Sequence, residues 1–395
     1  MADRICVIRQ RDYYELAVRR ETETLRDAGY EVDLICLAEE GHPREEVIND
    51  VHLYRLPLVR KKGSVLRYFY DYFSFLFLAA FKVAQLHLRK PYKVIQVNTM
   101  PDFLVFATLI PKLLGAKVIV FMKEPTPELG KTLFRAKWAP KVLAIVEQLA
   151  LRYADMAFTV TQQLKDVYVS RGANPDKIKV VLNGPDPHHF AAVSGGVRPD
   201  PNFFTLICHG AVEERYGHDT ILEAVSLARQ SVPNLRLRLI GTGSYVAEVN
   251  SMIKSLKIDD CVEYLGWISE EELANELHRA DVGLVAQKST PYSNLVHTNK
   301  MYEYFIFDKP AIVSRLDSTY HYFGDDSLFY FEADRPDCLA EVIVEVAGNP
   351  EMGRTKLAKA KELYQNYSWS AQSQIFLDSY RHLLGLESES QRAGV

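Results

Sequence analysis

The stretch from Asn299 to Ser314 has the residue types to bind a charged ligand. It reads Asn-Lys-Met-Tyr-Glu-Tyr-Phe-Ile-Phe-Asp-Lys-Pro-Ala-Ile-Val-Ser, which predicts a helix with a polar first turn and then a short apolar strand, 311–313. The free N–H groups and the dipole of a helix N-terminus favour anions such as a diphosphate. Glu303, one turn inside, can accept hydrogen bonds from two hydroxyl groups of a ribose. A diphosphate joined to a ribose occurs in a nucleotide sugar, which is the first hypothesis for the ligand.

A cation follows the first apolar run of the second half of the chain. The run 204–208 leads into His-Gly-Ala-Val-Glu-Glu-Arg-Tyr-Gly-His, residues 209–218, and Arg215 stands just before a predicted helix. A guanidinium group matches phosphate oxygens in a two-point geometry, so Arg215 can clamp a leaving diphosphate. The alternative is a surface arginine that pairs with Glu213 or Glu214.

Two further loops follow predicted strands in the second half. The glycines of Gly241-Thr242-Gly243 permit a tight turn and the close approach of a ligand, although a plain turn between a strand and a helix uses the same residues. Trp267 and Ile268 come after the next predicted strand. They can form a wall for a nucleobase, and packing in the core explains them equally well.

The first half of the chain offers one comparable loop. Residues 123–128, Lys-Glu-Pro-Thr-Pro-Glu, follow the apolar run 118–121. The prolines stiffen this loop. Glu124 or Glu128 can bind hydroxyl groups of a sugar or of an acceptor, and an exposed turn is the alternative.

The segment 55–93 is strongly biased in charge. It carries nine arginines and lysines against one acid, Asp71, with aromatic residues between them. A basic, aromatic helical segment suits contact with anionic lipid, or with an acceptor that carries a phosphate and an apolar chain. The alternative is an amphipathic helix that covers the first sheet. We assign most of the aromatic residues to this covering role and the cluster Arg60-Lys61-Lys62 to contact.

Short apolar runs that alternate with helical patterns must position these loops. The runs are 5–8, 31–37, 94–97, 118–121, 156–160 and 178–182 in the first half, and 204–208, 236–240, 262–265, 282–286 and 311–313 in the second. Strands that alternate with helices predict parallel sheets with helices on both faces. Two such series predict an α/β protein with two doubly wound domains. Ligands bind beyond the carboxyl ends of such strands, so two facing sheets place the site in the cleft between the domains.

The length of 395 residues suits two domains. We expect Rossmann-like domains at 1–190 and 203–365, with a linker at 191–202 that is rich in glycine, serine and proline. A helix at 366–386 is expected to cross back to the first domain, and a flexible tail is expected at 387–395.

Composition excludes several classes of protein. The net charge of −4 argues against a general nucleic-acid binder. The five cysteines are widely separated, which indicates reduced thiols rather than a disulfide framework or a zinc site. The chain has no apolar run long enough for a signal peptide or a membrane span, so we expect a cytoplasmic protein. It also lacks the common metal-binding, nucleophile and phosphate-loop motifs, which favours chemistry without a metal or a cofactor.

Taken together, these features resemble the family 4 glycosyltransferases, which are retaining enzymes of the GT-B fold. The likeness covers nearly the whole chain and rests on the order and spacing of segments 98–102, 123–128, 183–190, 210–217, 241–243, 264–266 and 299–314. The resemblance implies two Rossmann-like domains that face each other across a cleft, with the donor on the C-terminal domain and the acceptor in the N-terminal domain. It implies transfer of a hexose-like sugar from a UDP-sugar, or alternatively a GDP-sugar, with retention of configuration. The acceptor would be a glycan, a lipid-linked molecule or a small molecule, as in bacterial polysaccharide or glycoconjugate biosynthesis.

The resemblance also implies roles for single residues. Glu303 falls where the family binds the ribose hydroxyls, and the turn His297-Thr298-Asn299-Lys300 falls where backbone amides hold the diphosphate. Two residues are catalytic candidates, namely Arg215 near the family's basic loop and Glu124 near an acid of the N-terminal domain. The predicted donor-binding set is Gly210, Gly241, Gly243, Trp267, Ile268, His297, Thr298, Asn299, Lys300 and Glu303.

Two of the departures from the family's pattern bear on the donor site. The usual glutamate eight positions before Glu303 is Leu295, which leaves the donor sugar open. Ala211 occupies the first position of the usual basic pair. Two alternatives therefore stand beside the transferase, namely a nucleotide-sugar epimerase of the same fold and a catalytically inert GT-B partner subunit. Peripheral contact of residues 55–93 with the inner face of the membrane is a further expectation.

Overall fold

The chain forms two compact units in the computed structural model, which describes residues 2–39, 41–58, 65–133, 138–185 and 199–386. Unit 1 consists of Met1–Asn183 with Gln372–Val395, and unit 2 of Gly184–Ala371. Three predicted features lie outside the described residues, namely the cluster Arg60-Lys61-Lys62, most of the linker 191–202 and the tail 387–395. Within the described ranges, no helix is both long and apolar enough to cross a membrane.

Unit 1 is built on an eight-stranded sheet in the order β3-β4-β2-β1-β5-β6-β7-β8. Its strands are β1 (Arg4–Ile8), β2 (Glu31–Leu37), β3 (Glu45–Ile48), β4 (Val51–Leu56), β5 (Val94–Asn98), β6 (Lys117–Met122), β7 (Met156–Thr159) and β8 (Ile178–Val180). All neighbouring strands are parallel except β3 and β4, which form an antiparallel hairpin. Strands β1 and β5 are buried along their whole length, because helices cover both faces of a parallel sheet.

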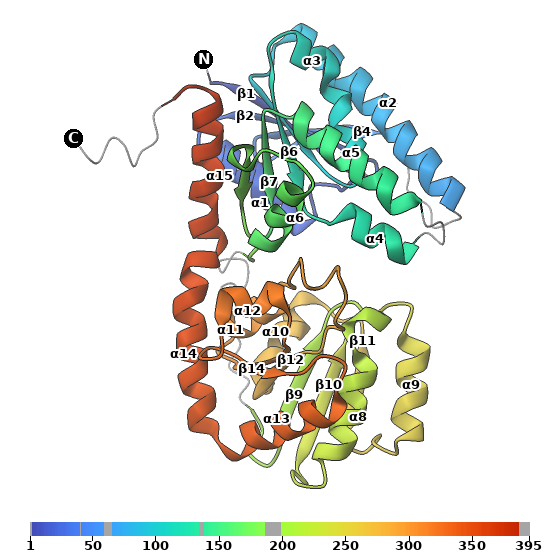
Figure 1. Ribbon diagram of the computed structural model, residues 1–395, viewed down its shortest axis with the longest axis vertical. Helices are drawn as coiled ribbons and strands as arrows, with labels where there is room; N and C mark the ends of the chain where they lie inside the picture. The colour runs from blue at the N-terminus through green and yellow to red at the C-terminus, as the bar shows by residue number, and fades with distance from the viewer. Residues whose placement is uncertain (1, 40, 59–64, 134–137, 186–198, 387–395) are drawn as a thin grey trace, which may run out of the picture. The chain divides into compact units, whose positions relative to one another are not determined.

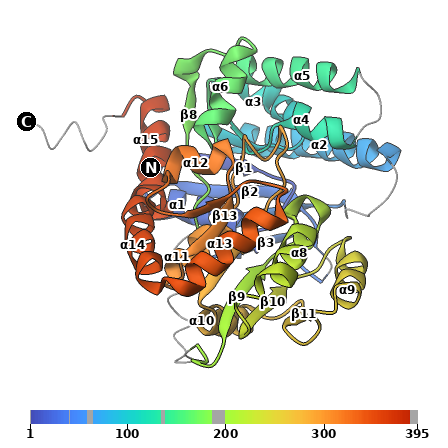
Figure 2. The same ribbon diagram turned by 60° about the horizontal axis from the view of Figure 1, so that its bottom comes forward.

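Helices cover the two faces of this sheet unequally. Those of unit 1 are α1 (Leu16–Asp27), α2 (Val65–Arg89), η1 (Asp102–Thr108), α3 (Leu109–Leu113), α4 (Thr126–Leu133), α5 (Ala139–Tyr153), α6 (Gln162–Ser170) and η2 (Pro175–Lys177). Helices α2, α3, α5 and α6 lie on one face, while α1 and the final helix α15 (Trp369–Leu383) lie on the other (Figures 1 and 2). Residues of α15 from Gln372 onward belong to this unit, and the hydroxyl of Tyr380 donates to Oε1 of Gln96 on β5 at 2.7 Å.

Unit 2 is built on a six-stranded, wholly parallel sheet in the order β11-β10-β9-β12-β13-β14. Its strands are β9 (Phe204–His209), β10 (Leu235–Ile240), β11 (Val262–Gly266), β12 (Val282–Val285), β13 (Ala311–Ser314) and β14 (Phe329–Phe331). Its remaining elements are η3 (Glu214–Tyr216), α8 (His218–Ala228), α9 (Val246–Ser255), α10 (Glu270–Arg279), α11 (Lys300–Ile306), α12 (Asp317–Phe323), α13 (Pro336–Gly348) and α14 (Pro350–Tyr367).

Two apolar cores fill the two sides of the second sheet. One includes Leu222, Val249 and Ile343, from α8, α9 and α13. The other includes Leu277 and Tyr304, from α10 and α11. The prediction of two doubly wound α/β domains is therefore confirmed, and the hairpin β3–β4 is an addition that the apolar runs did not predict.

Candidate functional site

The carboxyl ends of β9 and β12 mark the point where the strand order of unit 2 reverses. The chain runs from β9 outward to β10 and β11, and then crosses to β12 on the other side of β9. The loop after β9 and the loop after β12 lead in opposite directions along the sheet, which opens a crevice between them. Ligands of these folds bind in such a crevice. The two loops contact each other here, because a Cβ on Gly217 would lie 1.9 Å from the carbonyl oxygen of Ala286. The N–H of Lys288 also donates to the carbonyl oxygen of Arg215 at 2.9 Å.

Helix α11 is held close to the sheet at this point. A Cβ on Gly283 of β12 would lie 2.2 Å from the ring of Tyr304, so only glycine admits this ring. The hydroxyl of Tyr304 then donates to the carbonyl oxygen of Leu284 at 3.1 Å. The helix predicted from Asn299 onward is confirmed as α11, and Tyr304 in its second turn holds it against β12.

Lys300 brings a cation to the loop after β9. Its aliphatic stem lies against Gly210, where an added Cβ would be 2.5 Å from Cε of the lysine. Its ammonium nitrogen is 4.3 Å from the centre of the Tyr216 ring. Among the described residues Lys300 forms no ion pair, so its charge is available to a ligand. The sequence assigned Lys300 to the site through its backbone, and the structure adds its side chain.

Arg215 contacts the same aromatic ring. It is exposed on η3, and its guanidinium carbon lies 5.0 Å from the centre of the Tyr216 ring. The two cations of the candidate site are thus gathered around Tyr216, which sequence analysis did not single out.

Glu303 lies one turn after Lys300 on α11, where residues three apart share a face. Its side chain is four-fifths buried, and Oε2 lies 3.4 Å from Nε2 of His209. Burial raises the pKa of Glu303 to about 7, partly offset by Lys300. Burial and then Lys300 lower the pKa of His209 to about 3, so this imidazole is neutral at pH 7. The result is a carboxyl group that can change its protonation state near neutral pH.

His297 has a structural role for its side chain. Its Nδ1 is 3.0 Å from the carbonyl oxygen of Ser318, which can only accept, so Nδ1 carries the proton. Nε2 is 2.8 Å from the hydroxyl of Tyr302, which therefore donates to it. Burial lowers the pKa of His297 to about 4, in keeping with this neutral form. His297 thus fixes the loop before α11, and only its backbone remains for a ligand.

The start of α11 offers few but well-placed donors. The carbonyl oxygen of Asn299 accepts from the N–H of Tyr302 at 3.0 Å, and Oγ1 of Thr298 accepts from the N–H of Lys300 at 3.4 Å. Within the described part of the chain, the N–H groups of Asn299 and Met301 have no hydrogen-bond partner. Leu295, in the same loop, is half-buried.

Gly241 and Gly243 allow two strand-end loops to pack against each other. A Cβ on Gly241, at φ +133°, would lie 1.7 Å from the carbonyl oxygen of Gly210, and a Cβ on Gly243 would lie 2.0 Å from that of Val212. The N–H of Gly241 donates to the carbonyl oxygen of Gly266 at 2.7 Å. Loop packing alone therefore explains why these positions are glycine.

This packing predicts a difference between two alanine substitutions. Gly241→Ala should lower the free energy of unfolding by more than about 3 kcal/mol, because the added methyl group meets backbone. Gly266→Ala is the matched control, since it also has a positive φ (+69°) but open space around the position of the Cβ. It should cost only about 1 to 2 kcal/mol. Thermal unfolding of both variants measures the difference, and equal costs would contradict the packing argument.

Trp267 and Ile268 follow β11 on the outer side of β10. Trp267 is 77% exposed, so it is not a core residue. Ile268 is half-buried against the core that contains Tyr304. The backbone is fixed just beyond them by a capping box between Ser269 and Glu272.

In unit 1, residues 123–125 follow β6 as a loop, whereas residues 126–128 of the predicted loop already form the start of α4. The ammonium of Lys123 pairs with Glu21 of α1, which is completely buried and also accepts from Gln96 and Asn98 at 2.8 Å each. Burial lowers the pKa of Lys123 to about 8. Lys123 is thus part of the internal structure, while its neighbour Glu124 is half-buried. Glu124 belongs to unit 1 and Arg215 to unit 2.

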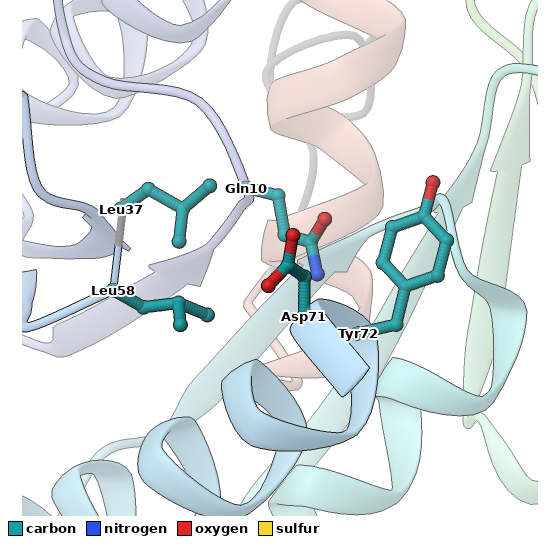
Figure 3. A pocket seen from close by; sticks show the side chains of 5 residues that line it. All are labelled: Gln10, Leu37, Leu58, Asp71 and Tyr72. Carbon is teal, nitrogen blue, oxygen red and sulfur yellow. The ribbon is translucent and has the colours of Figure 1, made fainter. Parts of the chain in front are cut away.

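A small cavity lies at the carboxyl ends of β1, β2 and β4. Its volume is about 10 Å³, room for roughly one water molecule. Figure 3 shows the carboxylate of Asp71 beside the amide of Gln10, with Leu37 and Leu58 on one side and Tyr72 on the other. It is too small to hold a sugar as it stands.

The basic segment 55–93 proves to be heterogeneous. Arg55 is buried, its Nε donates to Oδ2 of Asp12 at 2.5 Å, and its Nη1 donates to Oε2 of Glu46 at 2.7 Å. Lys82 pairs with Glu45 at 2.6 Å. Several of its cations therefore have structural partners, and Arg55 is not part of any contact surface.

Comparison with known proteins identifies the family. Residues 14–184 match the family model described as Glycosyl transferase 4-like domain, and residues 204–349 match the one described as Glycosyl transferases group 1. The chain belongs to the group 1 glycosyltransferases, of family 4 type. This glycosyltransferase is 26% identical over 225 residues to a D-inositol 3-phosphate glycosyltransferase of Pseudarthrobacter chlorophenolicus. The aligned residues are 53% of this chain and 51% of that relative, so the match spans about half the length of each.

Two solved structures illustrate the fold of this glycosyltransferase. Sucrose-phosphate synthase from Thermosynechococcus elongatus is 17% identical with a TM-score of 0.76, and the alignment covers 97% of this chain and 99% of that one. Anabaena HepE, solved with UDP and with UDP-glucose, is 14% identical with a TM-score of 0.72 for its UDP complex, over 96% of this chain and 100% of that one. These similarities show the GT-B fold.

Proposed function

We propose that this glycosyltransferase transfers a sugar from a nucleotide-diphosphate sugar bound at the carboxyl edge of the sheet of unit 2. The observation that carries the proposal is the pair formed by Lys300 and Glu303 on α11. One is a cation without an ion-pair partner among the described residues, and the other is a largely buried carboxyl group on the same helix face. Together they match a diphosphate and the ribose beside it.

The diphosphate is assigned to Lys300 and Arg215. Positive groups near a leaving phosphate stabilise the charge that develops when the glycosidic bond breaks. The N–H groups of Asn299 and Met301, which have no partner among the described residues, add donors at the start of α11. These groups supply the charge stabilisation without a bound metal, so we expect activity to persist in the presence of a chelator.

The ribose and the base are assigned to neighbouring positions. Glu303, as a carboxylate, accepts hydrogen bonds from two ribose hydroxyls, and Nε2 of His209 lies 3.4 Å from its Oε2. The backbone around Ile268 and the exposed ring of Trp267 border the base. UDP is the favoured nucleotide because HepE, which shares the fold, was solved with UDP and with UDP-glucose, and GDP is the second choice.

The reaction is proposed to retain the anomeric configuration. The hydroxyl of the acceptor attacks the anomeric carbon on the face that the diphosphate leaves, and a phosphate oxygen takes the hydroxyl proton. One C–O bond forms, one C–O bond to phosphate breaks, and a nucleoside diphosphate is released. Glu124 is the candidate for binding the acceptor, which would be a glycan, a lipid-linked molecule or a small molecule.

A thermal-shift screen of UDP, GDP, ADP and dTDP tests the proposal, because a ligand that binds only the folded protein raises its melting temperature. UDP at roughly 100 times its Kd is expected to add about 2.7 kcal/mol of stability. Absence of a shift with all four nucleotides would contradict the donor site. Consumption of a UDP-sugar without an acceptor, giving a second UDP-sugar, would identify an epimerase instead.

A further inference from the structure

The helix layer formed by α2, α3 and α5 carries an unusual number of exposed apolar side chains. We call its solvent side the outer helix face and define it by Phe77, Phe81 and Leu88 of α2, Leu113 of α3, and Trp138 and Ile145 at α5. These six side chains are between 60% and 78% exposed. Soluble proteins rarely expose so many large apolar groups together, so the outer helix face is expected to contact something.

The three helices are neighbours in space. Helix α2 packs against α3 and η1, and η1 packs against α5. The rings of Phe73 on α2 and Phe103 on η1 stack at 4.9 Å. Both views of the fold show α2, α3 and α5 together on one face of the first sheet (Figures 1 and 2).

On α2 and on α5, helical spacing places the exposed apolar side chains in one stripe along each helix. On α2, Phe73, Phe77 and Phe81 follow one another at intervals of four residues, while Phe75 and Ala79 of the same helix are completely buried. Helix α2 is therefore amphipathic with aromatic groups on both sides: one side packs in the core and the other faces water.

Helix α5 also carries a stripe of exposed apolar side chains. Trp138, Val142, Ile145 and Leu149 are four, three and four residues apart, and all four are exposed. The stripe leads to Arg152, one turn beyond Leu149. Apolar groups and a cation thus share this side of the helix.

The exposed charges of this layer are positive. The five acids between Val65 and Tyr153 are Asp71, Asp102, Glu124, Glu128 and Glu147. Four of them are buried and Glu124 is half-buried, so none is fully exposed. In contrast, Arg89, Lys141 and Arg152 are exposed and form no ion pair among the described residues.

We propose that the outer helix face binds the surface of a bilayer that contains anionic phospholipid. Aromatic and aliphatic side chains enter the boundary between headgroups and acyl chains, and the flanking cations attract the lipid phosphates. A second copy of the chain is a poorer occupant, because a two-fold interface would bring these cations together without acids to neutralise them. The net charge of the whole chain is −4, so the excess of cations on this face does not reflect the overall charge.

Vesicle co-sedimentation of the full chain tests the proposal. Vesicles with about 30% anionic phospholipid should bind the protein, whereas purely zwitterionic vesicles should bind it much more weakly. The double variant Phe77→Ser/Phe81→Ser should lose at least about tenfold in partitioning. Lys141→Glu/Arg152→Glu should lose at least about twentyfold on anionic vesicles, and added salt should weaken the wild type in the same way.

The control is Leu227→Ser on α8 of unit 2, which removes an exposed apolar side chain from another surface. It should bind vesicles like the wild type, and thermal unfolding of all variants checks that they remain folded. Equal binding of the outer-face variants and the wild type would overturn the proposal. A dimer in solution that Phe77→Ser/Phe81→Ser dissociates, without binding of vesicles by the monomer, would overturn it as well.

Discussion

Lys300→Met should lower kcat/KM for the nucleotide sugar by about 10²- to 10³-fold, the cost of removing one electrostatic group that acts on a developing charge. Methionine keeps an unbranched stem beside Gly210 and Tyr216, so the variant removes the charge with little loss of packing. Release of the nucleoside diphosphate from the donor, followed with a coupled assay, measures the effect.

Binding experiments separate charge from packing in this variant. Calorimetry should show a large loss of affinity for UDP and almost none for uridine, which lacks phosphate. Lys254→Met, at an exposed position on α9, is the matched control and should behave like the wild type. An equal loss for UDP and uridine would mean that Lys300 supports the shape of the site and does not bind phosphate.

Glu303→Gln should remove the pH dependence of UDP binding near neutrality. Because burial raises the pKa of Glu303 to about 7, the carboxyl is about half protonated at pH 7 in the free protein. Ribose hydroxyls donate to the carboxylate form, so binding favours loss of the proton. Affinity of the wild type should therefore rise with pH through 7, and between about pH 8 and about pH 6 it should fall about tenfold.

Comparison of the two proteins isolates this group. Titration of the UDP phosphate itself contributes equally to the wild type and to Glu303→Gln, so the difference between their profiles belongs to Glu303. The variant should also bind UDP about 1 to 3 kcal/mol more weakly at pH 8, since an amide cannot replace both accepting oxygens. Parallel profiles in the two proteins would exclude Glu303 from ribose binding.

The alternation of strands and helices was readable from the sequence because buried parallel strands form unbroken apolar runs. The hairpin β3–β4 was missed for a physical reason. Strand β3 lies at the edge of the sheet and alternates exposed and half-buried residues, so it has no such run. The turn of the hairpin, Asn49-Asp50, has positive φ at both positions. Asparagine and aspartate tolerate this conformation, so the pair Asn-Asp was the sequence signal that could have predicted the hairpin.

The candidate site was predictable in part. Lys300 and Glu303 lie three residues apart on one helix, so their common face follows from helical spacing. The contact of Lys300 with Gly210 and Tyr216 joins segments that are far apart in the chain, and no local pattern encodes it. No local pattern encodes the contact of Arg55 with Asp12 either, because only the folded structure brings the two residues together and buries them.

A crystal structure of the protein with UDP is the most direct test of the donor site. We expect the diphosphate beside Nζ of Lys300 and the ribose hydroxyls on the carboxylate of Glu303. The uracil should then lie near the backbone of Ile268. Nucleotide bound elsewhere, or a complex at saturating UDP in which Lys300 and Glu303 contact neither phosphate nor ribose, would contradict it.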